Sequence, residues 1–208
     1  ANEYMEMLAK GGFVVGMMAK LKYPTGFEVL GNTKEAIERT NEYLKQKNCI
    51  LFEAAFQSGE KLVRVDILEK KGNLVNLIEV KAKSHDTEDD PTNQKKVLTK
   101  YIDDVAFQYN VILEAYPDFN VTAYLLMPDK SKRTSIDGLA GWFSINQSND
   151  QSDIELDELP AQAKPKFNKP EVLFKYENDI NKSKYIHDIE VDGILQLRDV
   201  TLEVLKIQ

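Results

Sequence analysis

Three acidic residues and one lysine have types and spacings that suit metal-assisted phosphodiester chemistry. Glu53, Asp66 and Glu79 recur at intervals of thirteen residues, and Lys81 follows two residues after Glu79. Carboxylate oxygens are the ligands that Mg²⁺ and Mn²⁺ prefer in proteins. Such a cation polarises a phosphoryl oxygen and lowers the pKa of bound water, and a nearby ammonium stabilises the developing charge. In this chemistry, Lys81 would orient or activate the attacking water.

Two hairpin signals place these residues on neighbouring strands. Three runs have strand character and are separated by turns at Gly59-Glu60 and Gly72-Asn73: residues 50–56, 62–70 and 74–83. Asp66 and Glu79 are equidistant from the second turn, and Glu53 and Asp66 from the first. Regular hairpins would therefore set the three carboxylates in one row. Alternation puts Lys81 on the same face, with Arg64 opposite it.

The face that would carry this row is not purely polar. Regular alternation gives it five apolar side chains: Leu51, Leu62, Leu68, Val75 and Leu77. The other face is more apolar still: Ile50, Phe52, Ala54, Phe56, Val63, Val65, Ile67, Ile78 and Val80. We expect both faces to be covered, where unpaired charges are costly. The alternative is a set of ordinary charges on a half-exposed sheet.

Helices are predicted on either side of these strands in the sequence. The helical ranges are 3–21, 33–47 and 93–115, and an apolar strand is predicted over 121–127. A strand, a long helix and a strand form a crossover connection, which makes the last strand parallel to the third. We divide the chain into a core, 1–128, and an extension, 129–208, which packs on or continues the same domain. The extension contains an acidic linker near 148–160 and weaker signals over 139–145, 171–176 and 199–207.

Bulk composition limits the possible functions. The one cysteine, Cys49, excludes an intramolecular disulfide and a four-cysteine zinc or iron–sulfur site built from this chain alone. No apolar run approaches the roughly 20 residues that span a bilayer, so we expect a cytoplasmic protein without membrane contact. The net charge of −7 argues against a surface that binds nucleic acid everywhere, but it permits a local basic cleft.

Asp66, followed on the next strand by Glu79-Val80-Lys81, resembles the signature of the PD-(D/E)XK nuclease superfamily in its ExK form. The segments GFVVGMMAKLKYPTG, ILFEAAF, VDIL, LIEVK and DDVAFQYNV are similar to the RecB-like branch, especially an uncharacterised group of bacterial domains. The resemblance covers about residues 12–127. It implies an α/β fold with a restriction-endonuclease-like αβββαβ core, in which helices flank a mixed central sheet.

The resemblance also implies roles for particular residues. Asp66, Glu79 and the Val80 carbonyl would bind Mg²⁺ or Mn²⁺, with Glu53 at the branch's acidic position on the first strand. Lys81 would assist the water. Gln108 matches the glutamine of the branch's helical motif and joins the catalytic set. No iron–sulfur cluster is expected.

The chain departs from the RecB-like pattern at two positions. Gly16 stands where many members have a metal-ligating histidine, which could weaken metal binding. Ile112 occupies the usual tyrosine position of the helical motif, and Tyr109 instead follows Gln108 directly. Substrate contacts are therefore assigned more loosely, to Arg64, Asp104, Tyr109 and His85. Asp104 could also orient Lys81, although a solvated helix face explains Asp104 equally well, and His85 could be a simple exposed loop residue.

These observations predict a Mg²⁺- or Mn²⁺-dependent nuclease that hydrolyses DNA in repair, recombination or defence. RNA or a nucleotide is a possible substrate of the same site. The alternative is a catalytically inactive module of the same fold that binds nucleic acid or supports assembly. Further domains of a longer parent chain are possible partners.

Overall fold

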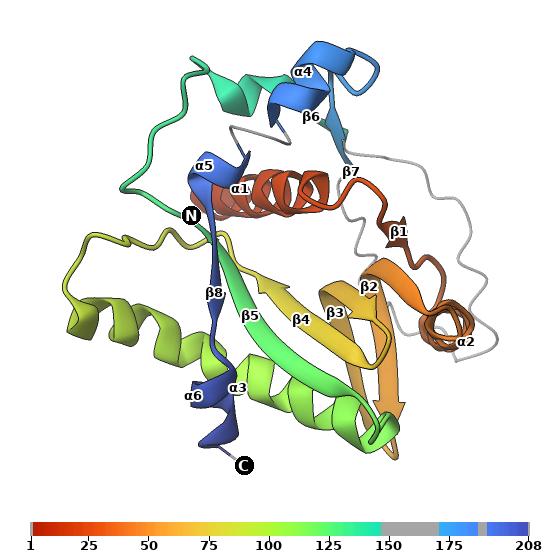
Figure 1. Ribbon diagram of the computed structural model, residues 1–208. Helices are drawn as coiled ribbons and strands as arrows, with labels where there is room; N and C mark the ends of the chain where they lie inside the picture. The colour runs from red at the N-terminus through yellow and green to blue at the C-terminus, as the bar shows by residue number, and fades with distance from the viewer. Residues whose placement is uncertain (1, 147–170, 187–190, 208) are drawn as a thin grey trace.

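A mixed six-stranded sheet with helices against both faces forms the centre of the molecule (Figure 1). The computed structural model describes residues 2–146, 171–186 and 191–207, so the predicted acidic linker near 148–160 lies outside the described residues. The elements are α1 (Asn2–Leu21), β1 (Phe27–Glu28), α2 (Thr33–Leu44), β2 (Asn48–Ser58), β3 (Lys61–Lys71), β4 (Leu74–Val80), α3 (Pro91–Ala115), β5 (Asn120–Pro128), η1 (Leu139–Trp142), β6 (Phe143–Asn146), β7 (Glu171–Phe174), α4 (Ile180–Tyr185), α5 (Val191–Ile194), β8 (Leu195–Asp199) and α6 (Thr201–Leu205).

The antiparallel meander of β2, β3 and β4 has the predicted register. Phe52 pairs with Ile67 across the first hairpin, and Ile67 pairs with Ile78 across the second. Gly59 and Gly72 in the two turns have φ values of +57° and +62°, a left-handed conformation that glycine adopts without strain. The short turns therefore fix the strand pairing, as the sequence indicated.

The crossover connection is also confirmed. β5 runs parallel to β4, with Glu79 paired to Leu125, and α3 spans the connection between them. β8 then pairs antiparallel with β5, so the sheet order is β1-β2-β3-β4-β5-β8. The C-terminal extension thus supplies one strand of the central sheet, beside β5.

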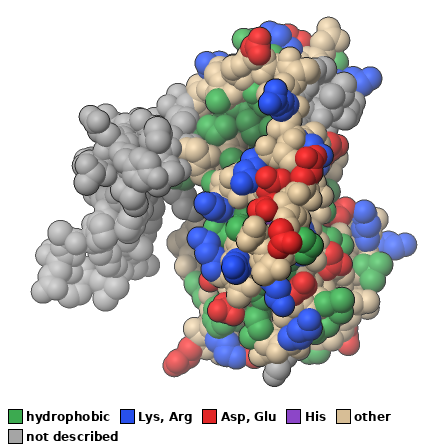
Figure 2. Space-filling model, turned by 90° about the vertical axis from the view of Figure 1, so that its left-hand side faces the viewer, with side chains coloured by type: hydrophobic (Ala, Val, Ile, Leu, Met, Phe, Trp, Pro, Cys, Tyr) green, Lys and Arg blue, Asp and Glu red, His purple; other side chains and the backbone are tan. Residues whose placement is uncertain are grey.

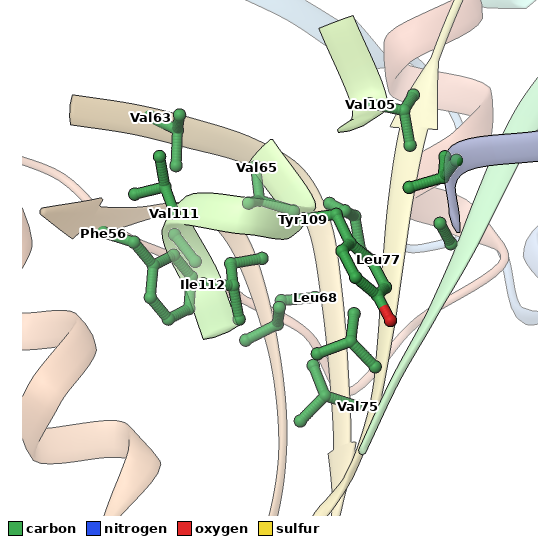
Figure 3. Close-up of a cluster of buried hydrophobic side chains, with 14 of the residues drawn as sticks. Phe56, Val63, Val65, Leu68, Val75, Leu77, Val105, Tyr109, Val111 and Ile112 are labelled. Atoms are coloured by element: carbon green, nitrogen blue, oxygen red, sulfur yellow. The ribbon is translucent and has the colours of Figure 1, made fainter. Parts of the chain in front are cut away.

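Two apolar layers cover the two faces of the sheet. The first, called here the α3 layer, joins the sheet to α3 and α2 and includes Leu68, Leu77 and Tyr109 (Figure 3). The second, called the α1 layer, joins the sheet to α1 and to the C-terminal extension and includes Met18, Phe52 and Ile78. Burial of both faces agrees with the sequence, and no helix in the described ranges is long and apolar enough to cross a membrane.

The alternation of side chains between the two faces slips by one residue in both strands of the first hairpin. Phe52 and Ile67 belong to the α1 layer, but Ala54 and Val65, two residues further along the pairing, belong to the α3 layer. Figure 3 shows Val65 on the same side as Leu68, three residues away in β3. Strict alternation would put residues two apart on one face. The predicted faces are therefore wrong for the part of the hairpin from Ala54 to Val65.

Glu53 and Asp66 are the residues at which the slip occurs. Glu53 has a φ of +59° and is the one non-glycine residue of the described ranges with a positive φ. The pairs Phe52 to Ile67 and Ala54 to Val65 flank these two residues, so both strands slip at opposite positions and the register is unchanged. Four residues predicted on the α1 side therefore pack in the α3 layer: Ala54, Phe56, Val63 and Val65. Leu62, predicted beside the carboxylates, is exposed instead.

The described part of the extension packs mainly over the α1 layer. β6 and β7 form a separate two-stranded sheet, whose Phe143 and Phe174 are buried in that layer. Trp142 and Tyr176 extend this aromatic group, with ring centroids 5.2 Å apart. The three weaker sequence signals therefore correspond to η1 with β6, to β7, and to the end of β8 with α6.

Candidate active site

Asp66 is a carboxylate with little compensation for its charge. The slip places it beside the end of β4, where its Oδ2 accepts a hydrogen bond of 2.7 Å from the Val80 amide. Burial raises the pKa of Asp66 to about 7, with further contributions from the negative charges of Glu79 and Glu53. The Val80 amide and Lys81 act in the opposite direction but are outweighed. The three predicted acids are therefore close enough to interact electrostatically.

Glu79 is held by two donors on its two oxygens. Lys81 Nζ lies 2.7 Å from Glu79 Oε1, and Gln108 Nε2 donates to Glu79 Oε2 at 2.8 Å. Glu79 is 8% exposed, so both contacts are shielded from water. The structure therefore brings together Asp66, Glu79, Lys81 and Gln108, the four residues predicted to be catalytic.

Gln108 has one polar atom with no partner. Its Oε1 is buried and makes no hydrogen bond among the described residues. The amide orientation is fixed, because the NH₂ group must face Glu79. A buried acceptor without a donor costs about 1–3 kcal/mol. The atom therefore marks a place beside Glu79 where a water or a substrate hydroxyl would be stabilised.

Lys81 is a cation at neutral pH. Burial lowers the pKa of its ammonium, but the hydrogen bond and charge of Glu79, together with those of Asp104, outweigh burial and leave the pKa raised. Asp104 Oδ2 lies 3.4 Å from Lys81 Nζ, and its side chain is 61% exposed. A protonated lysine offers charge and hydrogen-bond donors but no base. Lys81 is therefore suited to orienting a water or stabilising an anion.

Glu53 and Arg64 form a neighbouring pair. Arg64 Nε lies 3.8 Å from Glu53 Oε2, and its guanidinium also donates to the Val29 carbonyl at 3.1 Å. The ladder between β3 and β4 does not extend to Arg64, and Lys81 instead donates its amide to the Leu126 carbonyl of β5. Arg64 therefore compensates Glu53, and the predicted pairing with Lys81 does not form.

Two predicted substrate contacts lie away from the surface. Tyr109 is 6% exposed and its ring belongs to the α3 layer (Figure 3), because it stands one residue past Gln108 and therefore points away from Glu79. His85 is 3% exposed, and burial followed by the charge of Arg198 lowers its pKa. Their burial argues against direct contact with a substrate, and it contradicts the alternative that His85 is an exposed loop residue.

His85 borders a second buried carboxylate, Asp129, which follows β5. The Thr87 hydroxyl donates to Asp129 Oδ2 at 2.7 Å, and the Ser131 hydroxyl donates to Oδ1 at 2.8 Å. Burial alone would raise the pKa of Asp129, but the hydrogen bonds from Thr87 and Ser131 lower it to about 2. Asp129 thus joins the loop after β4 to the loop after β5.

The ligand atoms around Asp66 are of the type that a hard divalent cation prefers. Glu53, Asp66 and Glu79 offer only oxygen ligands, and the raised pKa of Asp66 records a negative charge that such a cation would offset. The side chains are not gathered for this role. No group of three or more His, Cys, Asp or Glu residues in the described ranges is arranged to hold a metal. Lys81 would have to leave Oε1 before Glu79 could present that oxygen to a cation.

Sequence reasoning missed one residue of this site, Tyr101. Lys81 Nζ lies 5.4 Å from the centroid of its ring. The helical spacing could have found it, because Tyr101, Asp104 and Gln108 are three and four residues apart and share one face of α3. The spacing of Tyr101 from Asp104 and Gln108 is therefore the sequence feature that indicates its place at the site.

Comparisons with known proteins assign no family to this chain. No family model matches the chain, and neither the curated proteins nor the solved structures include a match.

Proposed function

We propose that the chain is a metal-dependent nuclease of the PD-(D/E)XK superfamily, from its RecB-like branch, with a restriction-endonuclease-like core. One observation carries the proposal. Asp66, in the middle of β3, interacts electrostatically with Glu79, near the end of β4, while Lys81 Nζ lies 2.7 Å from Glu79. An under-compensated Asp66 beside a paired Glu79 and Lys81 suits phosphodiester hydrolysis better than a purely structural role.

The residues divide the work as follows. Asp66 and Glu79, with Glu53 and the Val80 carbonyl, would hold Mg²⁺ or Mn²⁺, which when bound polarises the phosphoryl oxygen and acidifies water. Lys81 donates hydrogen bonds to the water or to the phosphate and offsets the developing negative charge. Gln108 fixes Glu79 and offers its free Oε1 to a water proton. In the balanced reaction, the water oxygen forms a new P–O bond, the P–O bond to the leaving alkoxide breaks, and a proton released by the water goes to that alkoxide, so the products are a phosphomonoester and an alcohol.

DNA is the proposed substrate, contacted over a short length. Figure 2 shows the face that carries the N-terminal end of α3, where Lys and Arg side chains alternate with Asp and Glu. A mixed surface of this kind favours contacts near the scissile phosphate over a long basic track. The net charge of −7 agrees with such local binding.

A cleavage assay tests the proposal. Single- and double-stranded DNA would be incubated with Mg²⁺ or Mn²⁺ and the wild type, Asp66→Asn, Glu79→Gln or Lys81→Gln. Each substitution should lower the cleavage rate on the order of a hundredfold to a thousandfold, because each removes charge that stabilises the transition state. Glu69→Gln is the matched control, since Glu69 lies on β3 but contacts Asn76 and Lys71. Unchanged rates in the three site variants would refute the proposal.

A second candidate function is supported by the contacts of Glu79. Both of its oxygens are engaged by Lys81 and Gln108, and Gly16 stands where many RecB-like nucleases have a histidine. This arrangement would suit an inactive module that keeps the fold to bind nucleic acid. Binding of DNA by the wild type without cleavage in either metal would favour this candidate.

A further inference from the structure

Lys81 contacts three groups, and two of them belong to α3. Glu79 Oε1 is 2.7 Å from its Nζ, Asp104 Oδ2 is 3.4 Å away, and the Tyr101 ring centroid is 5.4 Å away. An ammonium near an aromatic face is attracted by the negative charge density of the ring. Lys81 is therefore shared between the sheet and the helix.

The helix side of this arrangement has a regular basis. Tyr101, Asp104 and Gln108 share one face of α3, and this face contacts both members of the proposed Glu79–Lys81 pair. The face is anchored by buried neighbours, Ile102 and Val105. Lys100 also lies against the Tyr101 ring, with Nζ 4.6 Å from the centroid. The buried neighbours thus hold the backbone at Tyr101, and Lys100 competes with Lys81 for the face of the Tyr101 ring.

We propose that Tyr101 and Asp104 form a second anchor that keeps Lys81 at the site when the charge of Glu79 is neutralised. This inference rests on the proposed function, in which Glu79 shares its charge with a cation and so attracts Lys81 less. Without the α3 anchor, a lysine side chain would lose its position to rotamer freedom and solvent. Tyr101 and Asp104 are positioning residues, because they act through Lys81.

Nuclear magnetic resonance of the Lys81 side chain tests the anchor without relying on activity. The ε-methylene protons of Lys81, assigned with Lys81→Arg, should show an upfield ring-current shift in the wild type that is absent in Tyr101→Leu. The decisive protein is Glu79→Gln, which neutralises Glu79 without a metal. A ring-current shift that survives in Glu79→Gln supports the anchor. Loss of the shift in Glu79→Gln overturns it, whether or not the protein cleaves DNA.

Kinetics provides the second arm. Tyr101→Leu and Asp104→Asn should each lower kcat about two- to tenfold with KM within about twofold, in the range of one cation–π or exposed charge contact. Tyr101→Phe keeps the ring and should restore kcat. Asp103→Asn, an exposed neighbour on α3, is the control for Asp104. Cleavage by the wild type together with unchanged kcat in Tyr101→Leu and Asp104→Asn would refute the anchor alone, whereas absence of cleavage by the wild type would refute the proposed function.

Discussion

Asp66 in β3 is partly buried and Asp129 just after β5 is buried, and their surroundings shift their pKa values in opposite directions. Burial raises the pKa of Asp66 to about 7, helped by two nearby acids and opposed mainly by one backbone amide. Burial also acts on Asp129, but the hydroxyls and amides of Thr87 and Ser131 lower its pKa to about 2. The two carboxylates therefore differ in pKa because Asp66 has one backbone donor and two acidic neighbours, whereas Asp129 accepts hydrogen bonds from Thr87 and Ser131.

The difference separates a structural site from a candidate functional one. Asp129 has its hydrogen bonds supplied by the protein and ties two loops together. Asp66 retains a charge that the protein does not offset, which lowers stability unless a proton or a cation is bound. Uncompensated charge of this kind is typical of sites where binding or catalysis uses the stored energy.

The pH dependence of stability is the strongest way to test this comparison. Between about pH 4 and pH 7, folded Asp66 binds more protons than unfolded Asp66, so the free energy of unfolding should fall as pH rises across this window and level off above it. The shift corresponds to at most about 4 kcal/mol. Urea unfolding of the metal-free protein and of Asp66→Asn, which keeps an acceptor for Val80, measures the effect.

In Asp66→Asn, the free energy of unfolding should fall much less between about pH 4 and pH 7 than in the wild type. The variant should therefore be the more stable protein at pH 8. Added Mg²⁺ should reduce the difference in the free energy of unfolding between the two proteins, because it stabilises the wild type alone. Parallel stability curves for the two proteins from pH 4 to pH 8 would contradict the assignment of an uncompensated charge to Asp66.

Asp129→Asn should change the free energy of unfolding in the opposite direction from Asp66→Asn, and by a smaller amount. It replaces charge-assisted acceptors with an amide that cannot accept from every donor of Thr87 and Ser131, so unfolding at pH 7 should become about 2 kcal/mol easier. The stability that Asp129 provides is present above about pH 4 and is lost as pH falls towards 2. Thermal unfolding at pH 7 and pH 3 measures both statements, with Asp118→Asn on the exposed loop before β5 as control.

The smallest expected effect concerns Glu53. Glu53→Gln removes one of the two negative charges that raise the pKa of Asp66, and the weaker of the two. Stability at pH 8 should rise by less than about 1 kcal/mol, and the midpoint of the Asp66-dependent fall should move to lower pH. A larger gain than from Glu79→Gln would mean that Glu53, and not Glu79, dominates the electrostatics of Asp66.

The parts of the fold set by local rules could be predicted from the sequence. The turns at Gly59 and Gly72 fix the hairpin register and so bring Asp66 and Glu79 together. The long helix between β4 and β5 indicates the parallel crossover. The slip at Glu53 could not be predicted, because a left-handed glutamate leaves no pattern in residue type. Alternation carried past that residue gives the wrong face to the apolar positions between Glu53 and Asp66, and the prediction recovers after Asp66 because the second strand slips as well.

Side-chain details that depend on distant segments were also beyond the sequence. Asp129 meets Thr87 only because β4 and β5 are parallel and end together, and residues 42 positions apart become neighbours. Tyr109 packs in the α3 layer and not beside Glu79, because one step along a helix from Gln108 turns the side chain by about 100°. Arg64 does not pair opposite Lys81 because β4 ends at Val80, before reaching that position.

The paired slip has a consequence for how this hairpin can tolerate extra residues. One additional residue in a single strand would shift the register and turn every later side chain to the other face. Glu53 and Asp66 occupy opposite positions, so excising both would leave each remaining pair matched and each remaining apolar residue on its present side. The hairpin therefore holds two carboxylates outside the regular alternation, while the apolar layers on its two faces keep their order.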